Sequence, residues 1–231
     1  MQQAFFDFQG SAVFGVLAFL LTGFLLLVAA VLLSWFLIGG RKLWAARLAK
    51  AMLAVAILYA SAILAFSWFS RQRVLAHGVE KYFCEVDCHL AYSVLSVEKV
   101  RALGNSTHSV AALGTFYVIR LRVRFDENTI RPTRGDFPLS PNPRLVSVVD
   151  GKGRQFAPQR NAAELLPKDQ AGSATLQDPL RPGESYAVTL VFDLPADVQE
   201  PRLLLASGDW QTQFLIGHEN SFLHRKTLFG L

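Results

Sequence analysis

The stretch SAVFGVLAFLLTGFLLLVAAVLLSWFLI, residues 11–38, and its companion AMLAVAILYASAILAFSWF, residues 51–69, decide the architecture of this chain. Neither run contains an Asp, Glu, Lys or Arg. About 20 apolar residues in a helix cross the core of a bilayer, whereas buried helices of soluble proteins usually keep a polar stripe. We therefore expect residues 1–70 to hold two transmembrane helices, at about 11–38 and 51–69.

The segment between the two runs, residues 39–50, sets the expected orientation. It carries basic residues and no acid, whereas the first ten residues carry Asp7 and no basic side chain. Basic loops favour the cytoplasmic side, so we expect a cytoplasmic loop with both ends of the chain outside. Arg71 and Arg73 favour the opposite orientation, but the loop has the larger basic excess. The first run is also too long, and its N-terminal flank too poor in basic residues, for a cleaved signal peptide.

Tryptophan and basic side chains mark the expected membrane surfaces. Indole rings near helix ends bury their apolar face while the N–H stays hydrated, and Lys and Arg interact with lipid headgroups. We expect the lipid bilayer to be a partner. The expected membrane-interface residues are Trp35, Arg41, Lys42, Trp44, Arg47, Lys50 and Trp68.

After residue 70 the composition changes, because charges, prolines and glycines enter and apolar residues alternate with polar ones. We expect a juxtamembrane connector at 71–89 and a water-exposed domain at 90–231. Residues 117–125 place apolar side chains on one face and three arginines on the other, which predicts a half-buried strand. Residues 186–194 repeat the pattern after the turn at Pro182 and Gly183.

Further strands follow from turn signals and short apolar runs. Residues 144–149 and 154–157 flank Asp-Gly-Lys-Gly at 150–153, which predicts a hairpin. We also expect strands at 93–103, 202–206 and 211–216, and a helical turn at 162–166. The tail at 219–231 is expected to be a last edge strand, with docking to the membrane surface or to a partner strand as the alternative. The expected fold class is an α+β membrane protein, a transmembrane helical hairpin followed by an all-β, antiparallel, immunoglobulin-like sandwich.

Three segments in this order carry a resemblance. They are the strand at 116–125, LVSVVDGKGRQFAP at 145–158, and DPLRPGESYAVTLVFDLP at 178–195 followed by RLLLASGD. Together they resemble the telokin-like immunoglobulin domains found outside the membrane in bacterial membrane proteins and lipoproteins. The resemblance covers about residues 90–217. It implies an extracytoplasmic interaction or accessory domain on the bacterial cytoplasmic membrane, facing the periplasm or exterior, and brings no shared catalytic residues.

The stretch YFCEVDCH, residues 82–89, contains both cysteines of the chain, Cys84 and Cys88. Outside the cytoplasm the compartment permits disulfides, so a Cys84 to Cys88 bridge is the leading interpretation. Such a bridge requires a bent backbone, because cysteines four residues apart on a straight strand lie too far apart to bond.

Two other interpretations of Cys84, Cys88 and His89 stay open. Thiolate and imidazole ligands suit copper, and the arrangement resembles subunit II of haem-copper oxidases, in which a C-x3-C motif is followed by a histidine. Here the cysteines precede the sandwich, and His89 directly follows Cys88. Covalent haem attachment is the third interpretation, because the motif differs from C-x-x-C-H by one spacer residue.

The functional expectation is a non-catalytic interaction or assembly module with a membrane-protein or envelope partner. The sequence contains no G-x-S-x-G, phosphate-binding glycine loop or H-E-x-x-H, so we expect no enzyme activity. The net charge of +5 is attributed to membrane topology and headgroup contact and not to nucleic-acid binding. The alternative is a copper-binding or electron-transfer accessory subunit that uses Cys84, Cys88 and His89. Otherwise no cofactor is expected.

Overall fold

The computed structural model describes residues 3–83, 89–104, 109–166 and 174–231. They form two compact units. The helix unit comprises Met1–Arg71 and Asp209–Arg225, and the sandwich unit comprises Gln72–Gly208 and Lys226–Leu231. In this division the chain from Gln72 onward groups with the sandwich, and a late segment, Asp209–Arg225, groups with the helices.

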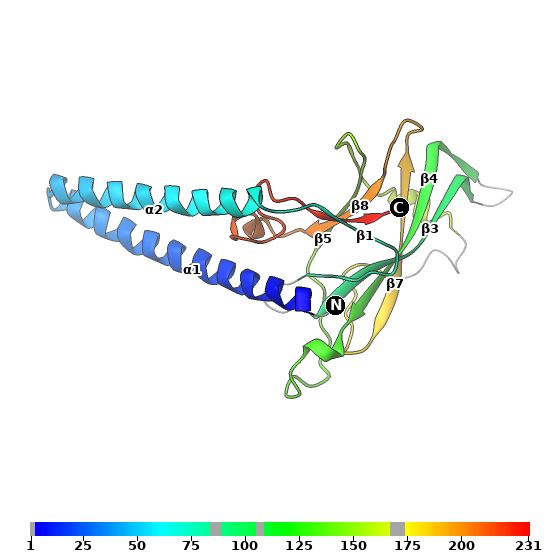
Figure 1. Ribbon diagram of the computed structural model, residues 1–231, viewed down its shortest axis with the longest axis horizontal. Helices are drawn as coiled ribbons and strands as arrows, with labels where there is room; N and C mark the ends of the chain where they lie inside the picture. Colours follow the sequence, from blue (N-terminus) through cyan, green and yellow to red (C-terminus); the bar gives the residue numbers. More distant parts are fainter. Residues whose placement is uncertain (1–2, 84–88, 105–108, 167–173) are drawn as a thin grey trace. The chain divides into compact units, whose positions relative to one another are not determined.

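The helix unit begins with an antiparallel hairpin, α1 (Gln3–Ile38) and α2 (Lys42–Trp68), drawn in blue and cyan in Figure 1. Gly40 makes the turn with a φ of 68°, a left-handed conformation that glycine adopts without strain. Both helices, over Val13–Ile38 and Lys42–Trp68, are long and apolar enough to cross a membrane by length and composition.

The second helix starts earlier than expected. The sequence pattern places residues 42–50 in the loop, but they form the first turns of α2. The reason is helix propensity, since Leu, Ala, Arg and Lys all favour helix and no Gly or Pro interrupts them. The connection between the helices is therefore a tight turn, and the basic residues after Arg41 lie on the helix.

The remaining part of the helix unit is the segment Asp209–Arg225, here called the return loop. The strand expected at 211–216 is wrong, because Trp210–Phe214 forms a 3-10 helix, η2. Thr212 explains the difference, since its amide (3.2 Å) and its hydroxyl (2.5 Å) both donate to the carbonyl of Asp209. A threonine that bonds its local backbone in this way competes with strand pairing.

The sandwich unit consists of two sheets. One sheet has the strand order β1-β9-β8-β5-β6 and the other β2-β3-β4-β7. The first contains β1 (Arg73–Leu75), β5 (Arg144–Val149), β6 (Gln155–Phe156), β8 (Arg202–Ser207) and β9 (Thr227–Gly230). The second contains β2 (Lys81–Tyr82), β3 (Leu90–Gly104), β4 (Ser109–Phe125) and β7 (Ser185–Leu194). Two short helices, η1 (Glu127–Thr129) and α3 (Arg160–Ala163), complete it.

One strand pair departs from the expected all-antiparallel arrangement. Strands β1 and β9 pair in parallel, with Arg73 opposite Thr227. Parallel neighbours require a long crossover, and here almost the whole sandwich separates the two strands in sequence. The pairing also places β9 between β1 and β8, so the last strand is internal to its sheet and not at an edge.

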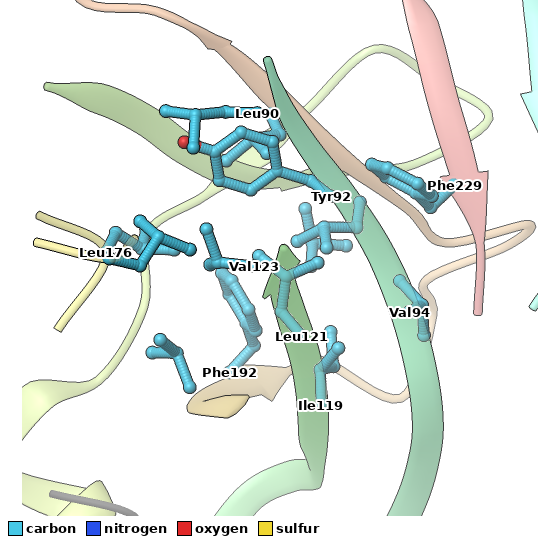
Figure 2. Packing of buried hydrophobic residues seen from close by; sticks show 14 of the residues in the cluster. Leu90, Tyr92, Val94, Ile119, Leu121, Val123, Leu176, Phe192 and Phe229 are labelled. Carbon is cyan, nitrogen blue, oxygen red and sulfur yellow. The ribbon is translucent and has the colours of Figure 1, made fainter. Parts of the chain in front are cut away.

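The main core lies between the two sheets. Alternate residues of β4, from Ile119 to Phe125, are fully buried, which confirms the predicted apolar face. Figure 2 shows Leu121 and Val123 of β4 packed with Tyr92 of β3 and Phe192 of β7. Residues from the other sheet complete this cluster, among them Leu203, Leu205 and Phe229.

The opposite face of β4 is not uniformly polar. Phe116 and Val118 lie on this opposite face before Arg120, and they are buried in a second cluster with Leu166 and Val191. Further along the same face Arg120 is exposed and Arg122 and Arg124 are half-buried. The helical turn expected at 162–166 is α3 with the residues that follow it, and it covers this end of the sheet.

Candidate functional site

The cysteine pair Cys84 and Cys88 lies outside the described residues, so its bonding stays a prediction. The residues on either side are described. Tyr82 pairs with Ala91, and the amide of Phe83 donates to the carbonyl of Leu90 at 3.4 Å. The cysteine segment therefore connects two paired, antiparallel strands, β2 and β3.

His89 follows the cysteine segment, and the structure holds its ring in place. The ring stacks on Phe125, with centroids 5.7 Å apart and planes 14° from parallel. Its Nδ1 lies 2.7 Å from the Thr129 hydroxyl, which donates its own proton to the carbonyl of Asp126 at 2.7 Å. Because a hydroxyl has one proton to donate, Nδ1 is the donor to Thr129, and in neutral His89 the lone pair lies on Nε2.

A cluster of charged and polar side chains that the sequence did not predict, here called the Arg124 cluster, comprises Glu80, Tyr82, Arg124 and Asp126. Arg124 donates to both oxygens of Glu80, from Nε at 2.7 Å and from Nη2 at 2.6 Å. Its Nη2 also lies 3.2 Å from Asp126 Oδ2. The Tyr82 hydroxyl donates to the same Asp126 oxygen at 2.5 Å and accepts from Arg124 Nη2 at 3.0 Å. One guanidinium thus joins two carboxylates and a phenol.

The cluster holds each member in one protonation state near neutral pH. Burial alone raises the pKa of Asp126, but hydrogen bonds from Tyr82, Arg124 and Asn128 outweigh it and lower the pKa to about 2. The Arg124 hydrogen bond lowers the pKa of Glu80. Burial, and then the bond to Asp126, raise the pKa of Tyr82 above its ordinary value. None of these three groups is suited to exchange a proton at pH 7, so the cluster acts as a structural clamp.

Lys81, the residue between Glu80 and Tyr82, points into the sandwich. It is 4% exposed. Its ammonium donates to the carbonyls of Leu205 (2.8 Å) and Thr227 (3.1 Å) and lies 4.8 Å from the centre of the Phe83 ring. Leu205 and Thr227 belong to β8 and β9, so Lys81 links the edge strand of one sheet to the other sheet. Adjacent residues of β2 therefore contact both β4, through Tyr82 and Arg124, and the opposite sheet, through Lys81.

The predicted interface residues gather at the turn of the helical hairpin, apart from Trp68, which ends α2. The guanidinium of Arg41 lies 5.7 Å from the centre of the Trp35 ring, and that of Arg47 lies 5.3 Å from the Trp44 ring. Phe36 lies between the two indoles. Lys42, Lys50 and all three tryptophans are exposed. This arrangement of basic groups over aromatic faces suits a headgroup layer.

Sequence reasoning missed the Arg124 cluster because its members are far apart in the chain. The alternation in β4 identified Arg124, but nothing local indicated that it pairs with Glu80, 44 residues away. Asp126 gave a weak signal, as an acid immediately after a buried strand. Within the described ranges no group of three or more His, Cys, Asp or Glu is placed to hold a metal ion.

No protein-family description and no curated protein sequence matches this chain. The structure is similar to uncharacterised bacterial proteins, including a conserved hypothetical protein from Bacillus anthracis (15% identity, 56% of this chain and 89% of that chain, TM-score 0.42). The others are the yjhA protein from Bacillus subtilis (14%, 68% and 98%, TM-score 0.39) and a β-sandwich protein from Clostridium difficile (9%, 70% and 95%, TM-score 0.34).

Proposed function

We propose that the chain is a membrane-anchored interaction module. In this proposal α1 and α2 span a bacterial cytoplasmic membrane with their basic turn inside. The sandwich, a telokin-like immunoglobulin domain, lies on the periplasmic or outer side and acts without catalysis, through contacts with a membrane or envelope protein. The observation that carries the proposal is a long, exposed, apolar hairpin joined to a separate domain with its own core.

The hairpin supports the anchoring role through its exposed apolar surface. Phe14, Leu27 and Leu58 are 73%, 65% and 72% exposed, and large apolar residues on both helices share this exposure. Moving one such side chain from water to an apolar medium contributes about 1.5–3 kcal/mol. An apolar surface of this extent is typical of helices that lie in lipid.

The interaction role is supported by the open edge of β3. In the described part of the chain, strand β2 pairs with Ala91 and Tyr92 of β3. Over residues 96–104 of β3, β4 is the only paired strand among the described parts of the chain. An open edge accepts a strand from a partner by main-chain hydrogen bonding. Glu98, Lys99 and Arg101 are exposed on this edge, and such charges favour selected partners over general aggregation.

Site-specific labelling tests the topology. Cysteines are introduced by Ala46→Cys near the helical turn and by Lys152→Cys in the β5–β6 turn, both exposed positions, in a background in which Cys84 and Cys88 are replaced by Ser. A membrane-impermeant maleimide should label Lys152→Cys in intact spheroplasts, and Ala46→Cys only after permeabilisation. The reverse pattern contradicts the orientation, and equal labelling of both positions contradicts the spanning hairpin.

Photo-crosslinking tests the interaction role. A photoreactive phenylalanine analogue at Glu98, on the β3 edge, should give one discrete cross-linked product in membranes. The same group at Lys152, on an exposed turn remote in sequence, is the matched control. Equal cross-linking from both positions, or none from Glu98, contradicts a binding role for this edge.

Copper binding is the second candidate, and the geometry of His89 favours it. Metal-ligating histidines commonly donate their other ring N–H to a nearby oxygen, as His89 Nδ1 does to Thr129 at 2.7 Å. Metal analysis and thiol counting on the detergent-purified chain, before any reductant is added, separate the candidates. Bound copper that is lost in Cys88→Ser supports the metal site. A metal-free protein without reactive thiols supports the disulfide, and a haem absorption band supports the third interpretation.

A further inference from the structure

The return loop, Asp209–Arg225, leaves the sandwich after β8 and rejoins it at β9, yet it groups with the helices. Three contacts hold it there. The Tyr59 hydroxyl of α2 donates to the carbonyl of Phe214 at 2.8 Å. The amide of Arg225 donates to the Ser70 hydroxyl at 2.9 Å. On α1, Gly15 is so close that an added Cβ would lie 2.4 Å from the carbonyl oxygen of Ile216.

These contacts place the loop beside the apolar part of the hairpin. Tyr59 lies nine residues before Trp68 in α2, which corresponds to about 13 Å along the helix axis. Gly15 lies two residues inside the apolar span Val13–Ile38. The carbonyls of Phe214 and Ile216 therefore meet the helices within their apolar length, at the end of the hairpin opposite its basic turn.

Non-helical backbone at membrane depth requires internal hydrogen bonds, because lipid offers none. The return loop has several. Asn220 donates from its side chain to the Thr212 hydroxyl at 2.7 Å and from its amide to His218 Nδ1 at 2.9 Å. Ser221 donates from its hydroxyl to the carbonyl of Leu215. Thr212, His218 and Ser221 are buried, so the loop has a polar interior.

Large aromatic and apolar side chains are exposed on the outside of the loop. Trp210, Phe222 and Leu223 are 64%, 54% and 78% exposed. Phe214 joins the first two, with ring centroids 6.0 Å from Trp210 and 5.9 Å from Phe222. A polar interior beneath an aromatic exterior is the reverse of a water-exposed loop.

Neighbouring residues favour the interface over the centre of the bilayer. Gln211 and Gln213 are exposed, which suits a hydrated layer. Trp68 is exposed at the adjacent end of α2, and Arg225, where the loop ends, is exposed and basic. Tryptophan with basic groups is typical of the boundary between headgroups and acyl chains.

We propose that the return loop is a lipid-binding segment that inserts Trp210, Phe222 and Leu223 into the bilayer at the headgroup–acyl boundary, in the outer leaflet of the proposed orientation. The inference rests on the proposed spanning hairpin and adds a second, peripheral attachment to the same membrane. It commits to lipid as the occupant because the loop backbone, at Phe214 and Ile216, contacts the helices within their exposed apolar spans.

Fluorescence quenching of single-tryptophan chains tests this directly. Trp35→Phe, Trp44→Phe and Trp68→Phe leave Trp210 as the only reporter, and a second chain keeps only Trp44. Both are reconstituted in phosphatidylcholine vesicles whose acyl chains carry bromine either near the headgroup or near the chain end. Bromine near the headgroup should quench Trp210 at least about twofold more strongly than bromine near the chain end. Brominated lipid should also quench Trp44, which reports on the hairpin and not on the loop.

Gly15→Ala and Gly23→Ala provide a matched pair. Both add one methyl group to α1, but only the first meets backbone, since nothing lies within 4 Å of an added Cβ at Gly23. Gly15→Ala should reduce lipid quenching of Trp210 about twofold or more and raise its quenching by aqueous acrylamide, whereas Gly23→Ala should change neither. Tyr59→Phe, which removes the bond to Phe214 without adding bulk, should act in the same direction as Gly15→Ala.

The outcomes separate this inference from the proposed function. Lipid quenching of Trp44 without lipid quenching of Trp210 overturns the loop proposal, leaves the spanning hairpin intact and indicates a protein-facing aromatic surface. Absence of lipid quenching at both tryptophans overturns both proposals. If Trp210 quenching is unchanged in both Gly15→Ala and Tyr59→Phe, the position of the loop does not depend on its contacts with the helices. That result also overturns the inference.

Discussion

Tyr82→Phe tests whether the Arg124 cluster stabilises the sandwich through a charge-assisted network. The change removes one hydroxyl that donates to Asp126 at 2.5 Å and accepts from Arg124 at 3.0 Å, and leaves the ring in place. The Asp126 side chain is 10% exposed, so water replaces the lost donor poorly. A hydrogen bond to a charged group contributes about 1.5–3 kcal/mol. We therefore expect the free energy of unfolding to fall by about 2 kcal/mol at pH 7.

The pH dependence provides a sharper test. Against burial, which raises it, hydrogen bonds from Tyr82, Arg124 and Asn128 together lower the folded-state pKa of Asp126 from 3.8 to about 2. The whole depression corresponds to about 2 kcal/mol, of which Tyr82 supplies a part. Stability from a depressed pKa is present above the unfolded pKa and is lost as the pH falls through the folded one. The cost of Tyr82→Phe should therefore be largest above about pH 4 and should shrink as the pH approaches about 2.

The assay is hydrogen exchange with mass spectrometry on the full chain in detergent, in increasing urea, followed on peptides from β3 and β4. Tyr186→Phe is the matched control, because the Tyr186 hydroxyl donates to a neutral acceptor, the carbonyl of Asp178, at 3.0 Å. Its cost should be about 1 kcal/mol and should not share the acid dependence. The charge-assisted mechanism is refuted if the two variants lose equal free energy of unfolding at pH 7 and also near pH 2.

Two further changes test contacts inside the sandwich, both read out as the melting temperature of its β-sheet circular dichroism signal. Gly114→Ala should destabilise by about 2–3 kcal/mol, because its Cβ would lie 2.2 Å from the carbonyl oxygen of Leu194, whereas Gly151→Ala, with a nearest approach of 3.4 Å, should cost far less. Lys81→Met should cost about 2–4 kcal/mol because it removes the buried ammonium that donates to the carbonyls of Leu205 and Thr227. Lys99→Met is the control for Lys81→Met, because Lys99 is exposed and also lies over an aromatic ring, at 4.7 Å; it should cost under about 0.5 kcal/mol. Equal losses for the two glycine variants, or for the two lysine variants, contradict the corresponding contact.

Local sequence determined the helical hairpin and most of the sandwich strands. Residues 11–38 and 51–69 are apolar without interruption, and such a run has few structural solutions. The alternation over 117–125 predicted which residues of β4 are buried, because side chains of a strand point to alternate faces. The Asp-Gly-Lys-Gly turn between β5 and β6 was also predictable, because its hydrogen bonds are local: the amides of Lys152 and Arg154 donate to the Asp150 carboxylate within the turn itself.

Tertiary structure decided the features that depend on residues far apart in sequence. The return loop contacts α2, where the Tyr59 hydroxyl donates to the carbonyl of Phe214, and this contact joins residues far apart in sequence. The pairing of Glu80 with Arg124, the linkage of Lys81 to the opposite sheet and the parallel pairing of β1 with β9 likewise join distant segments. A local pattern specifies which face of a strand or helix is apolar, but it does not specify the partner that covers this face. The partner decides the direction of strand pairing, the pairing of charges and the position of the return loop.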